Sequence, residues 1–121
     1  MSEVAERSTV DVLKAARDRI TPKDRWAHGW FARDAAGGPV SADSPEAVCW
    51  CVNGSLAVEL GVPADEATLE GLDAYEFLFA AAREIGDNSY PTEVNDFDGH
   101  DATLLMLDRA IQLAEQEAVS V

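Results

Sequence analysis

Hydrophobic residues recur with helical spacing near the start of the chain. Ser8 or Thr9 can cap a helix here, because a side-chain hydroxyl accepts a hydrogen bond from a backbone N–H of the first turn. Thr21–Pro22 ends the helix, since proline lacks the N–H that would continue it. The expected inward stripe is Val10, Leu13, Ala16 and Ile20. This segment therefore predicts a first amphipathic helix.

Two later segments have the same spacing. One helix is predicted from Asp73 to Ile85 and a final one from Asp101 to about Ala118, and Asp65–Leu69 predicts a shorter helical turn. The inward residues expected in the first of them are Tyr75, Leu78, Phe79, Ala82 and Ile85. Those expected in the final helix are Leu104, Leu107, Ile111 and Ala114.

A further segment is hydrophobic on nearly every face. Ser44–Pro45–Glu46 favours a helix start, because serine caps, proline suits the first helical position and glutamate faces the positive end of the helix dipole. Gly61 and Pro63 end the helix. A helix without a polar face belongs in the middle of a bundle. We therefore expect a central helix from Pro45 to Leu60.

The remaining segments predict little regular structure. Residues 34–39 are typical of a turn between two short strands, one near Trp30–Arg33 and the other near Val40. We expect loops at residues 86–91 and 95–100, with an extended piece at Thr92–Val94. The fold class predicted is mainly α, a compact bundle of about four helices with a small β-hairpin.

Length and composition predict a single domain over residues 1–121, with residues 1–7 disordered. The first residues contain charges and no apolar run, and no stretch approaches the roughly 20 apolar residues that span a bilayer. Two cysteines do not make a disulfide framework, which fits a reducing compartment. We expect a cytoplasmic protein without contact to membranes.

Charge is distributed unevenly along the chain. Residues 1–60 hold seven Lys/Arg against nine Asp/Glu, a net charge of −2, whereas residues 61–121 hold two against fourteen, a net charge of −12. Such a field repels nucleic acid and anionic membranes and attracts basic partners. The carboxylates at the centre of this imbalance are Asp65, Glu66, Glu70, Asp73 and Glu76. If residues 65–74 are helical, Glu66, Glu70 and Asp73 form one negative ridge.

This ridge has two interpretations. It is either a solvated face that aids solubility, or a surface that binds a basic groove and imitates the phosphates of nucleic acid. We expect the excess carboxylates to lie on the outer surface in either case.

The cysteines also have two interpretations. On the predicted helix, Cys49 and Cys51 point in opposite directions and act as small buried apolar residues. The alternative is a cysteine hydrolase or transferase, in which Cys49 at a helix start pairs with His100 and with Asn95 or Asp96 as the orienting group.

No metal or cofactor is predicted. The order of Cys49, Cys51, His28 and His100 matches no zinc-binding pattern. Asp96, Asp98 and Asp101 do not have the spacing of an EF-hand loop, and helix-start chemistry explains them.

Several short motifs resemble a family of small uncharacterised domains found in bacteria and phages. They are Trp26, Ala47–Cys51 with Gly54 and Leu56, Asn95–Asp96 with Gly99–His100, and Leu107–Ile111. In that family the second cysteine begins a Cys-x-x-Gly-Ala-Leu motif, and Ser55 replaces the alanine here. The resemblance implies a mostly helical domain in which the cysteine segment packs on the last helix, and it makes a phage or mobile-element origin plausible.

The function predicted is a non-catalytic acidic interaction module whose second half contacts a basic protein surface. For a phage protein, this would be an inhibitor of the anti-restriction or anti-CRISPR kind that occupies a nucleic-acid groove. The alternatives are the cysteine enzyme and a structural partner in a homo-oligomer.

Overall fold

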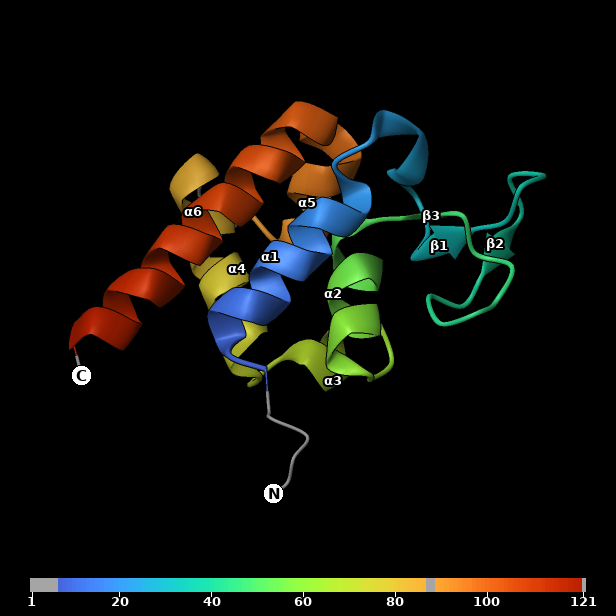
Figure 1. Ribbon diagram of the computed structural model, residues 1–121. Coiled ribbons are helices and arrows are strands. Elements are labelled where there is room, and N and C mark those ends of the chain that lie inside the picture. Colours follow the sequence, from blue (N-terminus) through green and yellow to red (C-terminus); the bar gives the residue numbers. More distant parts are fainter. Residues whose placement is uncertain (1–6, 87–88, 121) are drawn as a thin grey trace, which may run out of the picture.

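The computed structural model describes residues 7–86 and 89–120, and within these it is mainly helical (Figure 1). Its main helices are α1 (Thr9–Ile20), α2 (Val52–Leu60), α4 (Asp73–Ile85) and α6 (His100–Ser120). The shorter ones are η1 (Lys23–Arg25), α3 (Glu66–Leu69), α5 (Pro91–Glu93) and the π-helical turn η2 (Val94–Asp98). The predicted fold class is confirmed.

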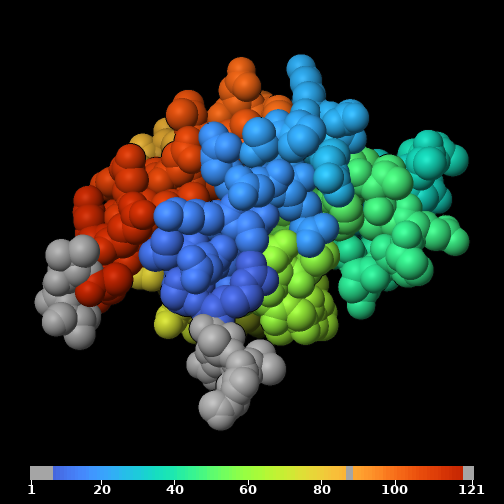
Figure 2. Space-filling view, viewed as in Figure 1, coloured from blue at the N-terminus to red at the C-terminus, as the bar shows by residue number. Residues whose placement is uncertain are grey.

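A small antiparallel sheet projects from one side of the helices (Figures 1 and 2). Its strands are β1 (Ala32–Arg33), β2 (Pro39–Val40) and β3 (Cys49–Trp50), in the order β2-β1-β3. Ala32 lies opposite Val40 on one side and Trp50 on the other. The predicted hairpin is therefore present, with a third strand that the sequence did not predict.

The N-terminal helix forms as predicted. The Ser8 hydroxyl accepts a hydrogen bond from the Asp11 backbone N–H at 3.0 Å and caps α1. The buried face of α1 packs against α2 and α6. This face consists of Val12, Leu13, Ala16 and Ile20, so Val12 takes the place predicted for Val10, which is half-buried.

Helix α4 has its predicted bounds and packs against α6, which begins one residue earlier than predicted. Its residues Tyr75, Leu78 and Ala82 are buried. The prediction that Ile85 faces inward was wrong, because this last residue of α4 is 45% exposed. None of the helices in the described residues is both long and apolar enough to cross a membrane.

The predicted helix from Pro45 to Leu60 was wrong in its first half. Residues 45–46 form a turn, in which the Ser44 hydroxyl accepts a hydrogen bond from the backbone N–H of Glu46 and does not cap a long helix. Residues 49–50 join the sheet, and α2 begins only at Val52. Gly61 ends α2 in a left-handed conformation with φ of 72°, as predicted.

Contacts with β1 explain why the chain is extended before α2. The backbone N–H of Cys51 donates to the Phe31 carbonyl at 3.1 Å. A Cβ atom at Gly54 would lie 2.1 Å from the same carbonyl oxygen, so glycine permits the first turn of α2 to approach β1. These tertiary contacts override the local helix-start signal at Ser44–Pro45.

The segment before α6 also differs from the prediction. The predicted extended piece at Thr92–Val94 is helical, and the predicted loop at residues 95–100 contains the turn η2. Arg7, predicted to be disordered, forms an ion pair with Glu59 at 2.8 Å. The rest of that predicted segment, residues 1–6, and residues 87–88 of the predicted loop at 86–91 lie outside the described residues.

Candidate functional site

The acidic residues predicted to bind a partner lie around α3 and the first turn of α4. We refer to them as the acidic surface, which consists of Asp65, Glu66, Glu70, Asp73 and Glu76. Asp65 caps α3, where its carboxylate accepts hydrogen bonds from the Thr68 backbone N–H at 2.8 Å and the Thr68 hydroxyl at 2.9 Å. These bonds lower the pKa of the Asp65 carboxyl, so it is ionised at neutral pH.

The acidic surface does not form a ridge on a single helix. The helical path ends at Glu70, whose ψ is 135°, and Gly71 has a φ of 88°. Two hydrogen bonds hold the turn between α3 and α4. The Tyr75 hydroxyl donates to Glu66 at 3.2 Å, and the Gly71 backbone N–H donates to Glu76 at 3.1 Å. The turn, and not helical periodicity, therefore sets the carboxylate spacing.

A hollow of about 420 Å³ lies between α3 and the start of α5. Glu66 and Glu70 line it from one side, and Tyr90 and Glu93 line it from the other. Glu93 is held by the Tyr90 backbone N–H, which donates to its carboxylate at 2.8 Å. The sequence analysis missed Glu93, because nothing in its local pattern places α5 beside α3.

A second hollow, of about 400 Å³, adjoins the start of α4. Asp73, Glu76 and Phe77 line it together with Glu117 from α6. The sequence analysis also missed Glu117, whose place beside α4 depends on the packing of α6. The acidic surface is thus extended by carboxylates from α5 and α6.

No lysine, arginine or histidine in the described part of the chain forms an ion pair with the acidic surface. Other acids of the second half are paired. Glu84 binds Arg109 at 2.8 Å, and Asp108 binds Arg17 at 2.5 Å. Uncompensated charge therefore lies around α3 and the start of α4, but Asp96, Asp98 and Asp101 near the start of α6 also form no ion pair with another described residue.

The two cysteines have different surroundings. Cys51 is buried at the N-cap of α2, where its sulfur accepts a hydrogen bond from the Gly54 backbone N–H at 3.3 Å. Burial raises the pKa of the Cys51 thiol to about 11, which keeps it protonated. Cys49 was expected to be buried on a helix but is half-buried on β3, with its sulfur 3.9 Å from the Arg33 carbonyl oxygen.

Cys49 therefore does not lie at a helix start, in contrast to the premise of the enzyme alternative. It lines a hollow of about 410 Å³ together with His28 and Arg33. No hydrogen bond joins Cys49 to His100, Asn95 or Asp96 within the described residues. The cysteine enzyme remains a hypothesis without a hydrogen-bonded Cys–His pair.

His100 and Asn95 contact the structural framework. The His100 ring nitrogen Nε2 lies 2.7 Å from the Ile20 carbonyl oxygen, and the ring packs on Trp26 with 5.2 Å between centroids. The Asn95 side chain accepts hydrogen bonds from the Trp26 indole N–H at 2.8 Å and the Val52 backbone N–H at 3.0 Å. It also donates to the Ala27 carbonyl at 2.9 Å. Asn95 thus connects η2, α2 and the segment after η1.

Asp96 also stabilises this junction, because its carboxylate accepts hydrogen bonds from the Gly29 backbone N–H and the Asn95 amide, both at 3.1 Å. Among residues 7–86 and 89–120, no three His, Cys, Asp or Glu side chains gather closely enough to hold a metal ion. Asp98 and Asp101 are exposed near the start of α6.

The comparisons with known proteins identify a family without a known activity. A family model described as a family of unknown function (DUF6197) matches residues 5–113. Neither the curated proteins nor the solved structures include a match to this chain. Because the matched residues cover most of the 121-residue chain, it belongs to the DUF6197 family.

Proposed function

We propose that this protein acts by binding, without catalysis, and that its acidic surface contacts a basic surface of a partner protein. The observation that supports this proposal most directly is the uncompensated charge around α3. Asp65, Glu66, Glu70, Asp73 and Glu76 form no ion pair in the described part of the chain, whereas Glu84, Asp108 and Glu115 are each paired with a basic side chain. Exposed carboxylates without neighbouring cations attract lysine and arginine side chains.

The shape of this region supports the same proposal. Glu66, Glu70 and Glu93 surround a hollow that Tyr90 also lines, and Tyr90 is 40% exposed. A cationic side chain in this hollow is attracted by the carboxylates and by the face of an aromatic ring. The partner that suits such a surface is a protein whose basic groove ordinarily binds nucleic-acid phosphates. In this form of the proposal the protein is an inhibitor that competes with nucleic acid, of the kind encoded by phages.

Pull-down from host lysate tests the proposal with two matched variants. The first neutralises the acidic surface with D65N, E66Q, E70Q, D73N and E76Q, which retain the side-chain acceptors. The control neutralises five other exposed acids with D18N, D24N, E46Q, D98N and D101N, so both variants have the same net charge. Bound proteins are quantified by mass spectrometry.

The wild type and the control variant should retain the same basic proteins, and the first variant should lose them. Addition of NaCl or of double-stranded DNA should release them, because salt screens the contact and DNA competes for it. Equal recovery by both variants would refute the proposal. Recovery that resists both salt and DNA would refute it as well.

A further inference from the structure

A groove of about 600 Å³ lies between the sheet and the end of α2, outside the hollows of the acidic surface. We refer to it as the hairpin groove. Trp30, Phe31 and Val40 line one wall, and Val58, Val62 and Pro63 line the other. Its volume lies within the range of roughly 300 to 1,000 Å³ that is usual for ligand sites. The protruding sheet in Figure 1 forms one side of this groove.

The walls expose apolar surface to water. Trp30 is 50% exposed, although it packs on the Phe31 ring with 5.7 Å between centroids. An exposed aromatic ring beside a concave apolar wall is typical of a surface that a partner covers.

The rim of the hairpin groove is negative on both walls. Asp43 lies on the sheet side and Asp65 on the helix side, and both are exposed. Neither forms an ion pair with another described residue. An occupant that complements this groove combines an apolar side chain with a neighbouring positive charge.

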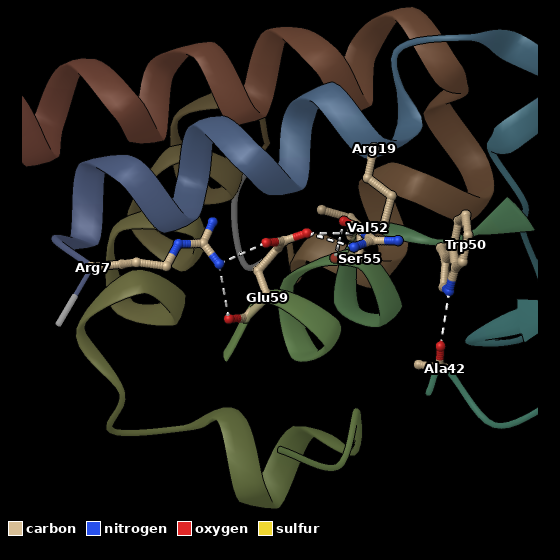
Figure 3. Close-up of polar contacts among 7 residues, drawn as sticks. All are labelled: Arg7, Arg19, Ala42, Trp50, Val52, Ser55 and Glu59. Carbon is tan, nitrogen blue, oxygen red and sulfur yellow. Dashed lines mark hydrogen bonds and ion pairs between the residues drawn. The ribbon is translucent and has the colours of Figure 1, made fainter. Parts of the chain in front are cut away.

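Contacts behind the groove anchor the loop that lines it (Figure 3). The Trp50 indole N–H donates to the Ala42 carbonyl at 2.9 Å, which anchors the loop that lines the groove. The Arg19 guanidinium lies over the Trp50 ring, 4.8 Å from its centroid, and it also donates to Glu59 at 2.7 Å. A groove with anchored walls binds without the cost of ordering them.

The turn after α2 anchors the opposite wall. The Val62 backbone N–H donates to the Ala57 carbonyl at 3.1 Å, and the left-handed Gly61 makes this return possible. On the sheet side, β2 is an edge strand, but Pro39 lacks the N–H that a partner strand would need. The groove is therefore suited to side-chain insertion more than to strand addition.

We propose that the hairpin groove binds an extended peptide segment of a partner protein, in which an apolar residue is flanked by lysine or arginine. The apolar side chain packs between Trp30 and Val62, and the cations face Asp43 and Asp65. This goes beyond the proposed function, because it concerns a different surface with an apolar anchor. Asp65 belongs to both surfaces, so the test leaves it unchanged.

The experiment is selection of a random dodecapeptide library displayed on phage against the purified full chain. The most enriched peptide is then synthesised with a fluorescent label, and its Kd is measured by anisotropy for the wild type and variants. The groove variants are Trp30→Ala and Asp43→Lys, and the matched controls outside the groove are Phe97→Ala, at an exposed aromatic residue, and Asp24→Lys. Circular dichroism and Tm establish that each variant is folded.

The selected sequences should contain an apolar residue beside Lys or Arg. Trp30→Ala should raise Kd about tenfold or more, as removal of a central aromatic anchor does. Asp43→Lys should also raise Kd, and a peptide with Glu in place of its Lys or Arg should recover part of the loss. Phe97→Ala and Asp24→Lys should leave Kd nearly unchanged.

Three outcomes would overturn the proposal. The first is that no sequence is enriched, and the second is that the enriched sequences lack basic residues. The third is that sedimentation shows the wild type to self-associate and Trp30→Ala to be a monomer, because the groove would then bind a second copy of the chain.

Discussion

The interface between α1 and α2 and the acidic surface around α3 both contain glutamates, but in opposite surroundings. Glu59 on α2 receives two arginines, Arg7 at 2.8 Å and Arg19 at 2.7 Å, and its side chain is only 11% exposed (Figure 3). Glu66 receives a hydrogen bond from the Tyr75 hydroxyl and no ion pair from the described residues. A carboxylate paired in this way stabilises the fold, whereas one without a neighbouring cation is available to a cation of a partner.

A substitution in the buried junction at Asn95 should change the stability of the protein much more than one in the acidic surface. Asn95→Ala should lower the free energy of unfolding by about 3 to 5 kcal/mol, because it leaves the buried Val52 N–H and Ala27 carbonyl without their partner. Urea denaturation measures this change. Asp98→Asn, at an exposed position in the same turn, is the control and should have little effect. A loss below about 1 kcal/mol for Asn95→Ala would mean that the junction does not hold the fold.

Gly54→Ala tests the close approach of α2 to β1. A Cβ at this position would lie 2.1 Å from the Phe31 carbonyl oxygen, so the backbone of one element must move. We expect urea denaturation to show that the free energy of unfolding falls by about 2 to 4 kcal/mol, as it does at other overpacked sites. Gly61→Ala is informative as a comparison, since its Cβ would meet nothing within 4 Å and only its φ of 72° would cause strain. Equal stability of Gly54→Ala and the wild type would contradict the structure at this contact.

Glu59→Gln tests the paired carboxylate directly. The variant retains the shape of the side chain but loses the charge. We expect the free energy of unfolding to fall by only about 1 kcal/mol, because solvent partly screens the ion pairs. Glu84→Gln, which removes an exposed pair with Arg109, should have a smaller effect. If Glu84→Gln lowered the free energy of unfolding more than Glu59→Gln, the view that the paired Glu59 stabilises the fold would be contradicted.

The lowered pKa of Glu59 predicts that its contribution to the free energy of unfolding falls at low pH. Burial raises this pKa, but the hydrogen bonds and charges of Arg19 and Arg7 outweigh burial and lower it below the ordinary value. The contribution of Glu59 is therefore fully present above the unfolded pKa of about 4.3 and is lost as the pH falls through the folded pKa. Stability curves measured from pH 6 down to about pH 3 should thus converge for the wild type and Glu59→Gln.

Neutralisation of the acidic surface should have the smallest effect on stability. The variant with D65N, E66Q, E70Q, D73N and E76Q should have a Tm equal to or slightly above that of the wild type, because removal of like charges relieves repulsion. The increase in Tm should be smaller when NaCl is added, because salt already screens this repulsion in the wild type. A marked fall in Tm would show that these carboxylates stabilise the fold, and the contrast with Glu59 would then fail.

Much of the helical framework could be predicted from local sequence. Ser8 caps α1, and Gly61 ends α2, because these signals act within one turn of the chain. The acidic surface was predicted from composition, since a run of carboxylates is visible without any structure. Glu93 and Glu117 could not be assigned to it, because their proximity depends on how α5 and α6 pack.

The sequence by itself determined the amphipathic helices, the Ser8 cap of α1 and the charge imbalance, which can be read from the sequence without any tertiary contact. Only the tertiary structure decided that residues 49–50 form a strand and that residues 94–98 form a π-helical turn. The reason is that the backbone of Cys51 and the side chain of Asn95 are satisfied by distant partners, Phe31 in the first case and Trp26 in the second. The hydrogen bonds that decide these two segments form only when the chain is folded.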